Sequence, residues 1–192
     1  MILNLKNEFL EIARTNIKRD GIEDLLTWVI NETDLFIAPA STKYHGACEF
    51  GLVTHSINVQ KCLLRLCEKM DIIGKESIAI VSLFHDLCKV NFYKIEMRNA
   101  KIDGKWEQVP YYTVEDQFPM GHGEKSLYLV NKFLKLSDDE ALAIRWHMGG
   151  FDESVKGGSY AGGNAYNKSK LAVMLHMADM MATYLLENES KV

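Results

Sequence analysis

The sequence has no long hydrophobic run, and its opening residues do not have the order of a secretory signal. No uninterrupted apolar stretch among the 192 residues approaches the about 18 needed to span a membrane. The first residues also lack the succession of basic, apolar and small residues that marks a signal peptide. We therefore expect a cytoplasmic protein without a membrane partner.

The sequence also lacks a regular framework of cysteines and a strong net charge of one sign. The four cysteines contain no CxxC pair and are typical of reduced, mostly buried thiols: Cys48, Cys62, Cys67 and Cys88. The 22 basic and 26 acidic residues leave a net charge of -4, which argues against a protein that coats long nucleic acid. Hydrophobic residues make up 47%, which excludes disorder and predicts a single domain over residues 1–192.

Apolar residues recur at helical spacing through most of the chain, which predicts an all-α fold. Ser137 and Glu140 spell a capping box at the start of one helix, and Asn167 is a candidate cap for the last. We expect a bundle of six or seven helices. The clearest lie within residues 2–13, 22–29, 52–70, 75–87, 137–146 and 168–187.

Two segments depart from the helical pattern. Strand-like residues over about 93–114 flank Asp103-Gly104, a dipeptide that is typical of a tight β-hairpin turn. Residues 149–167 hold six of the thirteen glycines, so we expect a loop there, either a mobile lid or a disordered connection. The predicted architecture is a helical bundle with one inserted hairpin and one glycine-rich loop.

Histidines and aspartates recur at intervals suited to successive helices of a bundle. The intervals are 30, 36, 25 and 32 residues along the series His55, His85-Asp86, His122, His147 and Asp179. Metal centres in helical bundles are built from such inward-facing side chains on facing helices. Any one of these histidines alone favours an ordinary core or surface role, whereas the ordered set favours a metal site.

The number of ligands indicates two divalent ions. Imidazole and carboxylate ligands suit manganese, iron or zinc, with nickel and magnesium as further occupants. If Asp86 bridges two ions, the other ligands divide between a first ion, bound by His55, His85 and Asp179, and a second ion, bound by His122 and His147. Asp179 lies on an otherwise apolar helix, where an unpaired carboxylate would be costly, and this favours its role as a ligand.

The order and local context of these residues resemble the HD-domain superfamily of metal-dependent phosphohydrolases. The resemblance covers about residues 40–185. It is carried by Gly51-Leu-Val-Thr-His55-Ser, Leu83-Phe-His85-Asp86-Leu-Cys-Lys89, Gly121-His122-Gly-Glu-Lys-Ser and a His147 that precedes the glycine-rich stretch. It implies a helical bundle around a mono- or dinuclear metal centre, which agrees with the helix pattern.

The resemblance also implies a mechanism in which Asp86 and Lys89 are catalytic. A hydroxide that bridges the two ions would attack phosphorus, since bound ions lower the pKa of water toward neutrality. Lys89 follows Asp86 by one helical turn, and by resemblance to His-Asp-x-x-Lys members it would bind a phosphate oxygen. The expected activity is hydrolysis of a nucleotide or another small phosphate ester.

Four further residues are candidates for substrate contact. Lys43 and His45 precede the first ligand helix, in a position that borders the active site of similar hydrolases. Tyr111 and Tyr112 follow a basic stretch of the hairpin, and basic residues interleaved with aromatics can hold a nucleotide. The alternatives are an ordinary polar loop for the first pair and a solvated charged hairpin for the second.

Other functions fit the same ligand order. Mixed-valent di-iron oxygenases of the myo-inositol oxygenase type present the same residues on a similar bundle, and a non-catalytic, metal-stabilised ligand-binding domain is a third possibility. Cys88 favours packing over ligation, and His176 favours the core over a place beside the metal ligands. Oligomeric state does not follow from the sequence.

Overall fold

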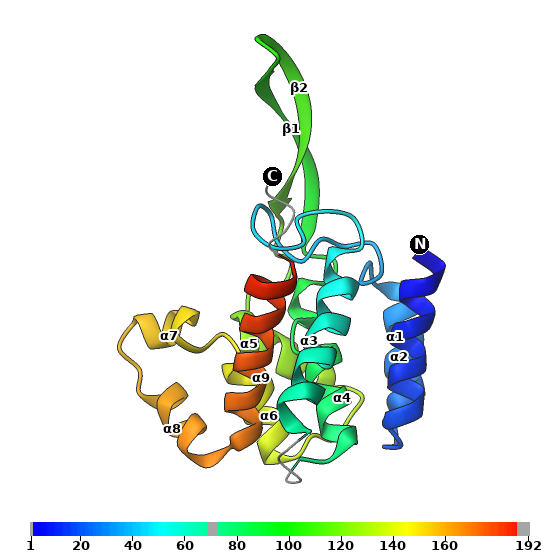
Figure 1. The fold of residues 1–192 in the computed structure, drawn as a ribbon, viewed down its shortest axis with the longest axis vertical. Helices are drawn as coiled ribbons and strands as arrows, with labels where there is room; N and C mark the ends of the chain where they lie inside the picture. Colours follow the sequence, from blue (N-terminus) through cyan, green and yellow to red (C-terminus); the bar gives the residue numbers. More distant parts are fainter. Residues whose placement is uncertain (1, 69–72, 188–192) are drawn as a thin grey trace.

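A computed structural model describes residues 2–68 and 73–187, and these form a helical body from which a β-hairpin projects (Figure 1). The longer helices are α1 (Ile2–Asn16), α2 (Ile22–Glu32), α3 (Gly51–Cys67), α4 (Lys75–Phe84), α5 (His122–Asn131), α6 (Asp138–Trp146), α8 (Ala161–Lys168) and α9 (Lys170–Met181). Shorter elements are α7 (Glu153–Lys156), the 3-10 turns η1 (Leu87–Lys89) and η2 (Gly149–Phe151), and the π-helix η3 (Ala182–Leu186). The all-α class is therefore confirmed, with nine α-helices in the described residues instead of six or seven.

The centre of the body is formed by α3, α4, α6 and α9. Helix α9 packs against both α3 and α6, and α4 packs against α3 and α6. Their contact surfaces are apolar and fully buried, for example at Leu52, Leu63, Ile80, Leu83, Ile144 and Leu175. Helix α1 covers this group through Phe9, whose ring meets Phe36 and Phe84 edge to face. The core thus brings together four of the five segments that carry the predicted ligands, and the fifth, α5, packs against α6.

The predicted hairpin is confirmed at the expected place. Strands β1 (Tyr93–Ile102) and β2 (Lys105–Val114) pair antiparallel, with Ile102 opposite Lys105 across a two-residue turn. Asp103 and Gly104 both have positive φ, at 48° and 84°. This is the backbone of a type I′ turn, which Asp-Gly favours because Gly adopts that region freely and Asp tolerates it.

Residues 149–167 are not the continuous loop that their glycines predict, since they contain η2, α7 and most of α8. Gly162 lies so close to the ring of Trp146 that a Cβ there would stand 3.2 Å from a ring carbon. The Tyr166 hydroxyl donates a hydrogen bond of 2.9 Å to the Trp146 carbonyl oxygen. The glycine at 162 therefore permits close packing of α8 on α6, and the expectation of a lid or disordered connection is corrected.

The helix ends follow the sequence only in part, because the helix expected over 75–87 ends at Phe84 and the one expected over 168–187 is α-helical only from Lys170 to Met181. The capping box is confirmed, because the side chains of Ser137 and Glu140 bond each other's backbone N–H groups. The last helix begins after Ser169, whose hydroxyl accepts from the Ala172 N–H at 3.3 Å, while Asn167 lies inside α8. The predicted end of the third helix, at residue 70, lies outside the described residues.

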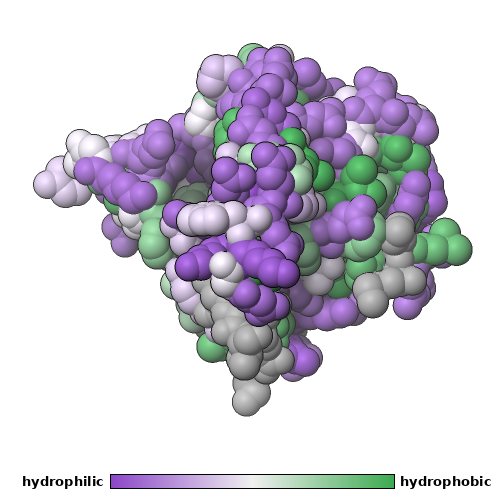
Figure 2. Space-filling view, turned by 90° about the horizontal axis from the view of Figure 1, so that it is seen from above, coloured by the Kyte–Doolittle hydropathy of each residue, from purple (hydrophilic) through white to green (hydrophobic). Residues whose placement is uncertain are grey.

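No helix among the described residues is long and apolar enough to cross a membrane. Seen from the hairpin end, most of the surface is hydrophilic, with hydrophobic residues gathered mainly toward one side (Figure 2).

Candidate metal centre

The six predicted ligands come from five segments that converge beside a cavity, whose wall includes Asp86, His122 and Asp179. His55 lies within α3, His85 directly follows α4 and Asp86 precedes η1, while His122 begins α5, His147 directly follows α6 and Asp179 lies in α9. All but His122 and Asp179 are completely or almost completely buried. The structure therefore brings together all six residues.

Local packing explains two of these positions. The last seven residues of α4 are all buried, so the chain leaves this helix inside the body and His85 and Asp86 follow there. At the start of α5, a Cβ on Gly123 would collide with the Arg145 carbonyl oxygen. Glycine at 123 thus allows α5 to approach the end of α6, which brings His122 next to His147.

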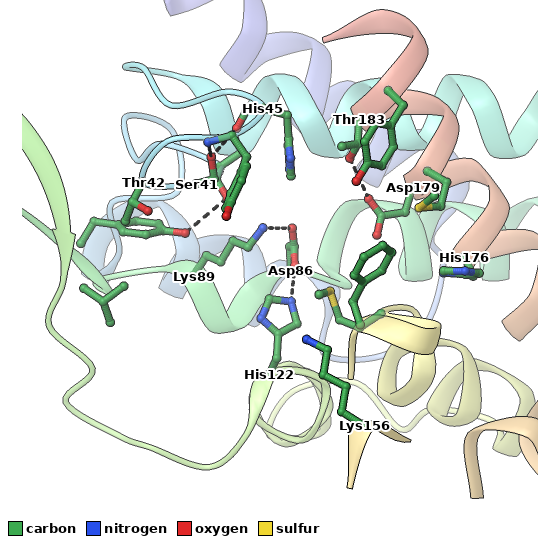
Figure 3. A pocket seen from close by; sticks show the side chains of 18 residues that line it. Ser41, Thr42, His45, Asp86, Lys89, His122, Lys156, His176, Asp179 and Thr183 are labelled. Carbon is green, nitrogen blue, oxygen red and sulfur yellow. Dashed lines mark hydrogen bonds and ion pairs between the residues drawn. The ribbon is translucent and has the colours of Figure 1, made fainter. Parts of the chain in front are cut away.

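The two carboxylate oxygens of Asp86 face two different pairs of histidines. Figure 3 shows its contacts with His122 and Lys89. Oδ1 lies 2.8 Å from His122 Nε2 and 3.5 Å from His147 Nε2. Oδ2 lies 3.6 Å from the Nε2 atoms of both His55 and His85. This division is the one expected of a carboxylate that bridges two ions.

Distances within each histidine pair fit a shared cation. Nε2 of His55 is 3.3 Å from Nε2 of His85 and 3.3 Å from the Asp179 Oδ1, and Nε2 of His122 is 3.2 Å from Nε2 of His147. Ligand atoms bound about 2.0–2.2 Å from one ion are separated by about 3.0–3.5 Å. The donor atoms thus have the spacing of ligands around an ion.

The other ring nitrogen of two ligands is held by a backbone carbonyl. His85 Nδ1 lies 3.0 Å from the Ser82 oxygen, and His147 Nδ1 lies 2.7 Å from the Ile144 oxygen. A carbonyl only accepts hydrogen bonds, so Nδ1 carries the proton and the Nε2 lone pair points to the centre. Metal-binding histidines are oriented in this way.

Glu187 orients His55 and was not anticipated from the sequence. Its carboxylate oxygens lie 3.0 and 3.2 Å from His55 Nδ1, and one of them accepts a hydrogen bond of 3.0 Å from the Asn58 amide. A carboxylate that holds the outer nitrogen of a ligand histidine is a recurrent feature of metal sites. No motif in the sequence marks Glu187, because its position depends on the π-helix that precedes it.

Electrostatics at the centre favour a cation. Burial raises the pKa of Asp86, but Lys89 and the surrounding histidines lower it well below its ordinary value, so the group is a carboxylate. Burial lowers the pKa of His85 to about 3, which keeps its imidazole neutral and able to bind a metal. Burial acts in the same direction on His55, yet hydrogen bonds and charges from Asp179 and Glu187 raise its pKa to about 10. The negative charge that holds this proton would hold a metal ion in its place.

Lys89 lies at the same centre. Its Nζ donates a hydrogen bond of 2.7 Å to the Asp86 Oδ2, and its side chain is only 12% exposed. Burial lowers the pKa of Lys89, but the charge of Asp86 raises it above the ordinary value, so the group is an ammonium. One positive side chain therefore stands beside the ligands at the cavity wall (Figure 3).

The cavity has a volume of about 650 Å³ and opens beside the base of the hairpin. Its walls include Lys89, His45, Tyr93, Phe151, Lys156 and Thr183. Of the predicted substrate residues, only His45 lines it: its ring centre is 4.7 Å from that of His55, and its buried Nε2 has no hydrogen-bond partner in the described residues. Lys156, Phe151 and Thr183 were not anticipated from the sequence, since they are ordinary residues that only the fold brings to the cavity.

The other three candidates lie outside the cavity wall. Lys43 is exposed, with its Nζ 5.1 Å from the centre of the Tyr44 ring. The hydroxyl of Tyr111 donates to Glu96 at 3.2 Å on the hairpin. Tyr112 pairs with Ile95 in the sheet. Substrate contact by these three residues stays a prediction.

Two residues beside the ligands have defined contacts. His176 Nδ1 lies 2.6 Å from the His147 carbonyl oxygen, and its ring stacks on that of Tyr166. The Cys88 Sγ lies 3.4 Å from His122 Nδ1, and the thiol is close enough to Asp86 and His122 to share an ion with them. His176 thus contacts the backbone of one predicted ligand, and Cys88 contacts the ring of another.

Comparison with known protein families identifies the family of this chain. The HD domain profile matches residues 52–183, which contain all six predicted ligands. The chain belongs to the HD domain family. This superfamily consists in general of metal-dependent phosphohydrolases, and the buried histidine and aspartate clusters are compatible with a metal site. No curated protein and no solved structure matches the chain.

Proposed function

We propose that this HD domain hydrolyses a nucleotide or another small phosphate ester at a centre of two divalent ions. The observation that carries the proposal is the position of Asp86, whose two oxygens face separate histidine pairs. His55, His85 and Asp179 would hold one ion with Asp86, and His122 and His147 the other. Manganese or iron fits these ligands, as do zinc, nickel and magnesium.

When bound, the ions would supply Lewis acidity toward a phosphoryl oxygen and would activate water as the nucleophile. The side chains of the protein have separate tasks. Asp86 and the histidines fix the centre, and the Lys89 ammonium binds a phosphate oxygen and neutralises charge that develops on it. Two of its three N–H groups remain for substrate after the bond to Asp86.

Cavity size and lining support a small substrate. A volume of about 650 Å³ is in the range of sites for nucleotide-sized ligands. Lys89 and Lys156 supply positive charge, and Tyr93 and Phe151 supply aromatic surface for a base or another flat group. We place a nucleotide-like phosphate ester here, with its phosphate toward Lys89.

The test compares wild-type protein with Asp86→Asn and with Asp139→Asn, after loading with manganese or iron. Asp139 is exposed at the start of α6, so this variant makes the same chemical change away from the centre. We expect the wild type and Asp139→Asn to release phosphate from a panel of nucleotides and phosphate esters, and Asp86→Asn to fall to background. Hydrolysis that survives in Asp86→Asn contradicts the proposal.

The oxygenase alternative is tested in the same samples. A di-iron oxygenase consumes oxygen and is inactive with manganese under nitrogen. Phosphate release by the manganese-loaded protein in the absence of oxygen supports hydrolysis. Oxygen uptake by the iron-loaded protein without phosphate release replaces our proposal by the oxygenase.

A further inference from the structure

The hairpin projects from the helical body (Figure 1), and one of its faces carries most of its exposed apolar side chains. Each strand has ten residues, and in the described part of the chain the strands pair only with each other. Cross-strand neighbours place Ile95, Met97, Pro110, Tyr112 and Trp106 on one face. Ile95, Met97 and Trp106 are exposed by 64%, 54% and 73%. A two-stranded ribbon with this much exposed apolar surface is marginally stable alone, which points to a partner.

The hydrogen-bond pattern shows which backbone N–H and C=O groups of the hairpin have no partner on the other strand. The Glu115 N–H donates to the Phe92 carbonyl at 2.9 Å, so this pair is hydrogen-bonded. Bonded and non-bonded pairs alternate in an antiparallel ladder. The N–H and C=O groups of every second residue of β1 from Tyr93 to Lys101, with Met97 in the middle, therefore point away from β2.

The two edges of the hairpin differ. Pro110 lies opposite Met97, in the outward-pointing set of β2, where its missing N–H costs the hairpin nothing but blocks an added strand. The outer edge of β1 contains no proline, so it can accept another strand along its length.

The charges on β1 indicate that the strand added at this edge comes from a second copy of the chain. We propose that two copies associate by pairing their β1 edges antiparallel about a twofold axis at Met97. This register places Glu96 opposite the partner's Arg98, and by symmetry the same pair forms twice. Among the described residues Arg98 has the Tyr111 ring 5.1 Å away and no carboxylate within ion-pair distance. A twofold axis at Asn99 would instead place Arg98 opposite Ala100, without a charge partner. An axis at Ile95 would place Glu96 opposite Lys94, which already pairs with Glu96 and Glu115 of its own chain, and would again leave Arg98 without a carboxylate.

In this register, the hairpin turn of each copy lies near the cavity of the other copy. Each Lys101 lies opposite the partner's Tyr93, and Tyr93 and Val114 line the cavity at the base of the hairpin. The turn of one copy, with Lys101 and Lys105, therefore reaches the cavity mouth of the other. The dimer would add positive charge to the entrance of each active site, and the pairing itself does not depend on the proposed hydrolysis.

The experiment measures mass in solution by sedimentation equilibrium on the full chain. We expect a mass twice the 21.9 kDa of one chain for the wild type. Met97→Pro removes an N–H that the hairpin does not use, and we expect a monomer with unchanged circular dichroism. Gln108→Pro is the matched control, because its N–H points outward on the β2 edge, and it should remain a dimer.

Charge reversal tests the register. Arg98→Glu and Glu96→Arg should each raise the dimer dissociation constant at least about tenfold, and the double variant should restore it. A wild-type monomer at about 100 μM overturns the proposal. A dimer that survives Met97→Pro, or that the double variant does not restore, overturns it equally.

Discussion

At the scale of single residues, contacts to the outer ring nitrogen orient three of the four histidines at the proposed metal centre. Ser82 and Ile144 carbonyls fix His85 and His147, and the Glu187 carboxylate fixes His55. These contacts keep three Nε2 atoms aimed inward before any ion is present. The folded protein therefore already orders these predicted ligands, and we expect metal affinity to depend also on residues that do not touch the metal.

Replacement of Glu187 tests this dependence. Glu187→Gln keeps the size of the side chain but removes the charge that supports His55. We expect about 10–100-fold weaker binding of manganese, measured by calorimetry on chelator-treated protein. Glu11→Gln on the exposed face of α1 is the control and should bind like the wild type. Equal affinity in Glu187→Gln shows that Glu187 does not position His55, whereas a wild type that binds no metal contradicts the metal centre itself.

The six ligand candidates could be predicted from the sequence because they stand in short local motifs that follow one another in a fixed order along the chain. Glu187 could not. Eight residues of α-helix would turn it about 80° away from Asp179. The π-helix turns less per residue, and the Glu187 N–H bonds to the carbonyl of Ala182, five residues back. This wider turn brings Glu187 to His55. The composition of residues 182–186 does not predict a π-helix.

At the scale of elements, Glu140 connects three parts of the fold. Its carboxylate is completely buried and accepts hydrogen bonds from the Ser137 N–H at 2.8 Å, the Ser77 hydroxyl at 2.7 Å and Arg19 at 2.6 Å. Burial raises the pKa of Glu140, but the bonds from Arg19, Ser137 and Ser77 together lower it below its ordinary value. The start of α6 is thus joined to α4 and to the turn between α1 and α2.

The stabilising effect of Glu140 should depend on pH. Because its pKa is lower in the folded than in the unfolded state, its contribution is complete above about pH 4.5 and is lost as the pH falls through the folded pKa. We expect Glu140→Gln to reduce the free energy of unfolding by about 2 kcal/mol at pH 7, measured with urea. The difference from the wild type should narrow at pH 3.5. A difference that does not change with pH contradicts this role of the charge.

Elements whose signals are local were predictable, and those that depend on packing were not. Asp103-Gly104 and the Ser137–Glu140 box contain within a few residues the groups that form the turn and the cap. Gly162, in contrast, has the same sequence signature whether it loosens a loop or permits contact with Trp146. Only the neighbouring helix decides between these outcomes, so α8 could not be inferred from its glycines.

At the scale of the whole molecule, five segments far apart in the chain meet at one buried group of charges. Asp86 is 3% exposed, and Asp179 and the four histidines surround it. Without a metal ion, Lys89 and protons on the imidazoles balance these carboxylates. A metal ion that binds the folded arrangement would find no such site in the unfolded chain, so we expect metal binding to stabilise the entire bundle.

Removal of metal should therefore lower the melting temperature of the whole protein in one transition. Ligand at 1,000 times its dissociation constant contributes about 4 kcal/mol, which for a chain of this size corresponds to on the order of 10 °C. We expect calorimetry to show this decrease after treatment with a chelator and recovery after addition of manganese. Asp86→Asn should melt at the same temperature with and without manganese, since it lacks the group that the two sites share. A wild type whose melting is indifferent to both treatments would show that the six ligands converge without binding an ion.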